Sequence, residues 1–125
     1  MSIDIQPTLD VVADVVAERK RQNRKWGQQD HRDADPDLLD RPGGATPARL
    51  ADELEIPTAG RAKYLCNEAA RTGRPSWSVI LIEEVAEAVE AIGDDVALRD
   101  ELVQVAAVAV AWIEAIDRRR VRDAP

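Results

Sequence analysis

The chain has 125 residues, with 24 acidic against 17 basic side chains and a formal net charge of −7. A chain of this length forms a single domain with a core of modest size, which association with further copies would help to stabilise. The negative charge disfavours a nucleic-acid partner, because such binding uses a basic face to neutralise phosphates. We therefore expect one domain over residues 1–125 that does not bind nucleic acid.

The cysteine usage and the hydropathy pattern favour a cytoplasmic protein. Cys66 is the only cysteine, so no intrachain disulfide is possible. The N-terminus is acidic and lacks the apolar run of a signal peptide. The longest apolar run, residues 105–113, is far shorter than the roughly 20 residues that span a bilayer, so we expect no membrane partner.

Helical periodicity dominates the sequence, and no alternating strand pattern of useful length occurs. The first expected helix has an apolar stripe beginning at Leu9 and runs to about Arg24. Residues 25–44 are polar and rich in Asp, Pro and Gly, which predicts a long loop. Thr46 and Pro47 are typical of a helix start, so a short helical segment is predicted over residues 46–53.

Three further helices are expected after this segment. Pro57 opens one that ends near residue 71, before a Thr-Gly-Arg-Pro sequence. Ser76 caps the next, which ends at the Gly-Asp-Asp sequence of residues 93–95. Asp95 caps the last helix, which continues from Val96 to about Arg119.

The last expected helix determines the architecture. Between residues 102 and 116 it is apolar almost all round, interrupted by Gln104 and Glu114. Such a helix is buried on several sides, which in a small domain implies contact with another subunit. We predict an all-α bundle of four to five helices that forms a homodimer or homotetramer. The arginines of residues 118–122 are interpreted as cations placed favourably at a helix C-terminus.

A cluster of acidic side chains is predicted where the last two helices meet. Residues three apart on a helix point the same way, so Glu84 and Glu87 project together, as do Glu101 and Gln104. Antiparallel packing would bring three carboxylates and one amide oxygen together, and their repulsion requires a cation or shared protons. Hard oxygen ligands of this number suit Mg²⁺ or Mn²⁺.

The alternative interpretation is that these acids are ordinary solvated surface charges. Glu83, Glu90 and Asp94 fall opposite the apolar face of their helix and fit this description. Glu84 lies at the margin of the apolar arc instead, and Glu101 shares a stripe with Val105. A carboxylate aimed at a core costs several kcal/mol unless it is paired or binds a metal.

The motif Glu-Glu-x-x-Glu at residues 83–87, followed after 13 residues by Glu-x-x-Gln at 101–104, resembles the signature of the MazG-like all-α nucleoside triphosphate pyrophosphohydrolases. The resemblance covers residues 76–117 and extends more loosely over the first helix and loop. It implies that Mg²⁺, or alternatively Mn²⁺, is bound by Glu84, Glu87, Glu101 and Gln104. The family has Asp where this chain has Gln104, and the neutral amide is a weaker ligand.

The resemblance also implies the reaction, which is hydrolysis of a nucleoside triphosphate to a monophosphate and pyrophosphate. The catalytic residues would be Glu84, Glu87 and Glu101, which hold the metal, and Glu83 or Glu87, which orients or deprotonates water. The competing hypothesis is a non-catalytic acidic helical bundle that binds a nucleotide or a protein partner.

The segment after the first expected helix concentrates cations, amides, a tryptophan and the only histidine. Trp26 either covers one end of the bundle or stacks on a nucleobase, as such loops do in the MazG-like enzymes. In the second case Gln29 and His31 would bind base or sugar edges, and Arg21 or Lys25 would meet phosphate oxygens. A further phosphate contact is possible at Lys63, which is otherwise a solvated helix lysine.

Overall fold

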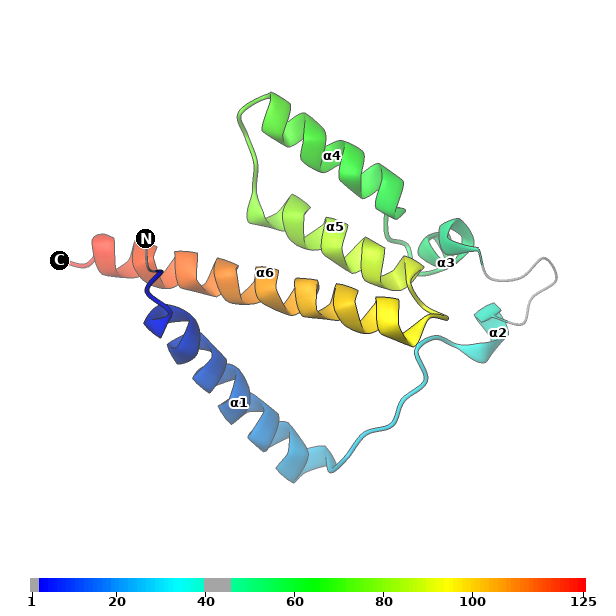
Figure 1. The fold of residues 1–125 in the computed structure, drawn as a ribbon, viewed down its shortest axis with the longest axis horizontal. Coiled ribbons are helices and arrows are strands. Elements are labelled where there is room, and N and C mark those ends of the chain that lie inside the picture. Colours follow the sequence, from blue (N-terminus) through cyan, green and yellow to red (C-terminus); the bar gives the residue numbers. More distant parts are fainter. Residues whose placement is uncertain (1–2, 40–45) are drawn as a thin grey trace. The chain divides into compact units, whose positions relative to one another are not determined.

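The computed structural model describes residues 3–39 and 46–125. Of the long loop predicted over residues 25–44, residues 40–44 therefore lie outside the described residues. Within these ranges every regular element is a helix, which confirms the all-α prediction. The elements are α1 (Gln6–Trp26), α2 (Pro36–Leu39), α3 (Pro47–Glu53), α4 (Ala59–Arg71), α5 (Trp77–Glu90) and α6 (Asp95–Arg122), labelled in Figure 1. The short α2 falls inside the segment that the composition predicted to be loop.

Two helices begin where the capping residues predicted. The Thr46 hydroxyl accepts a hydrogen bond from the Arg49 amide at 3.2 Å, at the start of α3. The Ser76 hydroxyl accepts from the Val79 amide at 3.5 Å, at the start of α5. Each side chain satisfies one of the amides that the first turn of a helix leaves without a backbone partner.

Two other predicted starts are wrong, by two residues for α4 and by one residue for α6. Thr58, and not Pro57, precedes α4, and its hydroxyl accepts from the Arg61 amide at 3.1 Å. Asp94, and not Asp95, caps α6, since its carboxylate accepts from the Ala97 amide at 3.1 Å. In both cases the residue that precedes the helix is the one whose side-chain oxygen reaches an amide of the first turn.

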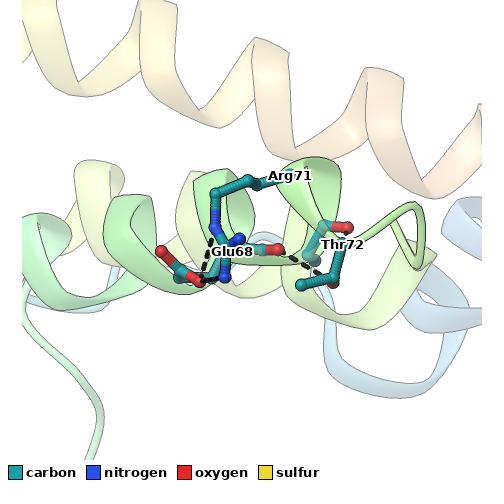
Figure 2. Close-up of polar contacts among 4 residues, drawn as sticks. Glu68, Arg71 and Thr72 are labelled. Carbon is teal, nitrogen blue, oxygen red and sulfur yellow. Dashed lines mark hydrogen bonds and ion pairs between the residues drawn. The ribbon is translucent and has the colours of Figure 1, made fainter.

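The C-terminus of α4 is closed by its own side chains (Figure 2). The Arg71 guanidinium pairs with the Glu68 carboxylate at 2.7 Å, and the Thr72 hydroxyl donates to the Glu68 carbonyl at 2.9 Å. Gly73 follows with φ of 72°, a left-handed conformation that glycine adopts without strain. The predicted Thr-Gly-Arg-Pro stop therefore acts through a side-chain cap as well as through Gly73.

The chain divides into two compact units, and the first comprises residues Arg32–Val108. Here α5 contacts both α3 and α4. Among the described residues of this unit, the buried ones are Leu50, Ala51, Ala62, Ala86 and Ala88. Most are alanines, whose small side chains let helix backbones approach closely. Two polar contacts join α4 to α5: the Cys66 thiol donates to the Val79 carbonyl at 3.2 Å, and Glu90 Oε1 accepts from the Ala59 amide at 3.2 Å.

The second unit comprises Met1–His31 and Ala109–Pro125, and so contains α1 and the second half of α6. Val11 of α1 is buried, and the Thr8 hydroxyl donates to Glu114 Oε1 at 2.5 Å. The helix α6 is continuous over 28 residues and belongs to both units. None of the helices in the described ranges is long and apolar enough to cross a membrane.

Replacing Glu55 by glycine should stabilise the protein. Glu55 follows α3 with φ of 58°, a conformation that is unfavourable for a residue with a Cβ atom. Glu55→Gly should raise the free energy of unfolding by roughly 0.5–1 kcal/mol, because relief of this strain exceeds the entropy that glycine adds to the unfolded chain. Urea denaturation measures the change. Glu55→Ala is the control, since it removes the charge but keeps the Cβ atom, and an equal gain from alanine would contradict the backbone explanation.

Candidate metal centre

Three carboxylates converge between α5 and the first half of α6. Glu84 and Glu87 come from α5 and Glu101 comes from α6, and one oxygen from each lies within 4.8 Å of the other two. All three side chains are half-buried and belong to the unit of residues Arg32–Val108. The spacing of three residues on α5 places the first two side by side, and the turn before α6 brings up the third. The structure therefore brings together three of the four predicted metal ligands.

The electrostatics of this cluster are unfavourable without a cation. Burial raises the pKa of Glu84, and the charges of Glu101 and Glu83 raise it further. Burial likewise raises the pKa of Glu87, with additional contributions from Glu84, Glu101 and Glu83. No lysine or arginine within the described ranges forms an ion pair with the three carboxylates. Their charge is thus left for protons or a bound cation to neutralise.

The donor set fits a hard divalent cation. Three carboxylates supply the oxygen ligands that Mg²⁺ and Mn²⁺ prefer, and their common separation allows one ion to contact all of them. Binding would also offset the repulsion among the carboxylates, which adds to the effect of burial in raising the pKa values of Glu84 and Glu87.

Gln104 follows Glu101 by one turn of α6, and its side chain is exposed whereas that of Glu101 is half-buried. Three residues rotate a side chain by about 60° around the helix, which here is enough to carry the amide toward solvent.

Glu83 adjoins the cluster on the side of α4, where Cys66 lies. Burial raises the pKa of the Cys66 thiol to about 11, and a hydrogen bond to Glu83 and the charges of Glu83, Glu84 and Glu87 contribute. Sequence reasoning missed this proximity, because Cys66 and Glu83 come from different helices and no spacing rule connects them. The thiol beside the cluster is therefore protonated at neutral pH.

An aliphatic hollow of about 250 Å³ lies between α5 and the first half of α6. Seven aliphatic side chains of these two helices and the turn between them line it, among them Val85, Ala88 and Val105, together with Asp33. Val85 and Ala88 directly follow Glu84 and Glu87 in sequence, so the hollow and the carboxylates share these helices. The low polarity of its lining is consistent with the raised pKa values of the acids.

A second hollow, of about 330 Å³, lies at the C-terminal end of α1. It brings together four residues predicted to bind substrate, and the complete lining is Glu18, Arg21, Gln22, Lys25, Trp26 and Gln29. Glu18 and Gln22 were not predicted as site residues, although they lie three or four residues from other members of the lining on α1, a spacing that places side chains on one helix face.

The side chains around this hollow contact one another. Lys25 Nζ lies 4.8 Å from the centroid of the Trp26 ring, while Arg21 pairs with Glu18 at 2.6 Å. The amide of Gln29 lies 3.2 Å from the His31 ring nitrogen Nε2. Lys63 is exposed on α4 and belongs to the other unit.

Comparison of the chain with protein-family models, with curated proteins and with solved structures finds no match.

The stability of the metal-free protein should depend on pH through Glu84 and Glu87. Their pKa values are raised in the folded state, so folding favours their protonated forms, and this contribution is lost as pH rises from about 4.5 through the raised values. At pH values above this range Glu84→Gln should therefore raise the melting temperature, and at pH 4 it should change the melting temperature little. Differential scanning calorimetry in chelator tests this.

The matched control is Asp100→Asn, an exposed position next to Glu101. It should leave the melting temperature unchanged at both pH values. If Glu84→Gln were destabilising at pH 8 without divalent cations, the carboxylates would not be repelling one another as described.

Proposed function

We propose that this chain is a Mg²⁺- or Mn²⁺-dependent nucleoside triphosphate pyrophosphohydrolase of the MazG-like all-α type. It would be a cytoplasmic homo-oligomer that cleaves a ribo- or deoxyribonucleoside triphosphate between the α- and β-phosphates. The observation that supports this most directly is the convergence of Glu84, Glu87 and Glu101. The same three residues occupy metal-ligand positions in the motif that resembles this family.

The chemistry assigned to the site is metal-assisted hydrolysis. The cation, when bound, neutralises the negative charge of the phosphate oxygens during transfer. Glu84, Glu87 and Glu101 hold the cation, and Glu83 or Glu87 orients the attacking water and accepts its proton. Cys66 of α4 lies close enough to Glu83 for this carboxylate to contribute to the raised pKa of the thiol. A covalent nucleophile is not required.

The hollow at the end of α1 supplies groups suited to a nucleoside and its phosphates. The Trp26 side chain is 61% exposed, which leaves ring surface for a nucleobase to stack on. Lys25 adds a cation beside the ring, and Gln29 and His31 offer hydrogen-bonding groups at the same end of the helix. Arg21 would exchange its pairing with Glu18 for a phosphate oxygen. Lys63 is a weaker candidate for such a contact.

A second candidate function is a non-catalytic bundle that binds a nucleotide or a protein partner. The observation that favours it is Gln104, which is neutral and exposed where the family motif has an acidic ligand. In this case the three glutamates would be the remainder of a metal site that no longer supports turnover.

Product analysis tests the proposed activity. Purified protein is incubated with each common ribo- and deoxyribonucleoside triphosphate and Mg²⁺ or Mn²⁺, and the products are separated by ion-exchange chromatography. We expect monophosphate and pyrophosphate, with a loss of at least about 100-fold in kcat/KM for Glu84→Gln, because the metal loses a charged ligand. Full turnover by the Glu84→Gln/Glu101→Gln double variant would refute the mechanism.

Gln104→Asp should tighten metal binding. The substitution restores a carboxylate one turn from Glu101, and rotation of its side chain toward the cluster would add a fourth charged ligand. Titration calorimetry with Mn²⁺ should give a dissociation constant lowered by about tenfold, with Asp100→Asn unchanged. Unaltered affinity in Gln104→Asp would show that position 104 does not reach the metal.

A further inference from the structure

The hollow at the C-terminal end of α1 contains a carboxylate that the substrate contacts described above leave unused. Among the described residues that line the hollow, Glu18 is the only acid, and it lies beside the cations Arg21 and Lys25, two glutamines and Trp26. A carboxylate repels phosphate groups, so it would weaken binding in a hollow that received only the phosphates of a nucleotide. Glu18 is suited instead to a group that donates hydrogen bonds.

Glu18 is ionised and acts as a hydrogen-bond acceptor. A hydrogen bond from Arg21 and the charge of its guanidinium hold the pKa of Glu18 below its usual value, and a hydrogen bond from Gln22 adds to the effect. Glu18 Oε2 accepts from Arg21 Nε at 2.8 Å, and Oε1 accepts from the Gln22 amide at 3.3 Å. The two carboxylate oxygens therefore match an edge of a ligand that carries two adjacent donors.

Guanine is the common base with such an edge. Its N1–H and its 2-amino group are adjacent donors on the Watson–Crick edge. Adenine and cytosine place an amino donor next to a ring nitrogen that accepts, and uracil and thymine place N3–H between two carbonyl oxygens. Each of these bases would set an acceptor near the second carboxylate oxygen, which is repulsive. A carboxylate thus favours guanine through attraction and disfavours the other bases through repulsion.

The remaining groups of the hollow complement a guanine ring. Trp26 is 61% exposed and offers ring surface for stacking. Lys25 Nζ, which lies 4.8 Å from the centroid of this ring, is a cation of the kind that donates to O6 and N7 of guanine. Gln22 and Gln29 add amide donors. Eight residues separate Glu18 from Trp26, about 12 Å along the helix axis, a span that the two side chains and a two-ring base fill together.

We propose that this hollow selects guanine, with Glu18 accepting hydrogen bonds from N1–H and the 2-amino group while Trp26 stacks on the ring. The inference rests on the proposed function, in which the same hollow receives the base of the substrate, and it names guanosine or deoxyguanosine triphosphate as that substrate. When the base engages Glu18, Arg21 is released and becomes available to a phosphate oxygen. All of these residues belong to the unit that contains α1.

Comparison of guanosine monophosphate (GMP) with inosine monophosphate (IMP) tests the proposal. The two nucleotides carry the same phosphate, sugar, N1–H, O6 and N7, and differ only in the 2-amino group. Binding is followed in chelator through the indole N–H signal of Trp26 in NMR spectra, assigned by its absence from Trp26→Phe. The wild type should bind GMP about tenfold more tightly than IMP, because IMP forms one hydrogen bond fewer to the carboxylate.

Glu18→Gln should remove this difference. The glutamine side chain has one acceptor and one donor group, so it cannot accept from both donors of guanine. It matches instead the amino group of adenine and the ring nitrogen beside it. The ratio of GMP to IMP affinity should fall to about one, and adenosine monophosphate should bind more tightly than it does to the wild type. A merely structural role of Glu18 would weaken the binding of all three nucleotides alike.

Asp14→Asn is the matched control, since it removes a carboxylate one turn earlier on α1, at an exposed position outside the hollow. It should keep the wild-type ratio of GMP to IMP affinity. Equal affinities of the wild type for GMP and IMP, or an unchanged ratio in Glu18→Gln, would overturn the proposal. So would a Trp26 signal that does not respond to GMP at about 5 mM, a concentration that occupies even a weak nucleotide site.

Base recognition and turnover are measured separately, because chelator removes divalent cations from the carboxylate cluster. A wild type that binds GMP selectively but hydrolyses no nucleoside triphosphate would refute the proposed function and leave the guanine site standing. Turnover that favours another base would support the proposed function and overturn guanine selection.

Discussion

The arrangement of α5 and the first half of α6 has to withstand the mutual repulsion of three half-buried carboxylates. Glu84, Glu87 and Glu101 lie within one ion's reach of each other, without an ion pair in the described ranges to offset their charge. The helix α5, which carries two of them, is kept in place by its contacts with α3 and α4. The scaffold therefore resists a repulsion that protons or a divalent cation would relieve.

The helix pattern was predictable because it depends on local chemistry. Capping side chains identified the starts of α3 and α5, and the predicted starts were wrong by one or two residues where two plausible candidates were adjacent, at Pro57–Thr58 and Asp94–Asp95. There the sequence offers both residues, and the backbone path decides which precedes the first turn. The four-residue α2 was missed because so short a helix has no periodicity to detect.

The carboxylate cluster was also predictable, since helical spacing fixes Glu84 beside Glu87 and a short turn places Glu101 opposite them. The exposure of Gln104 was not, because a rotation of about 60° separates an inward from an outward position and depends on tertiary packing. The proximity of Glu83 to Cys66 could not be predicted for a similar reason. Cys66 is far from Glu83 in sequence, and its position follows from how α4 lies on α5.

Because Cys66 is protonated in the folded protein, the rate at which its thiol reacts reports how often α4 separates from α5. With a pKa of about 11, fewer than about one thiol in a thousand is ionised at neutral pH, so alkylating reagents react slowly with the folded chain. When α4 detaches, the thiol leaves both the Val79 carbonyl and the acidic side chains, and its reactivity returns toward that of a free cysteine. The rate of thiol labelling therefore counts local openings of this helix pair, at a residue that lies beside the carboxylates yet is not one of the three that converge.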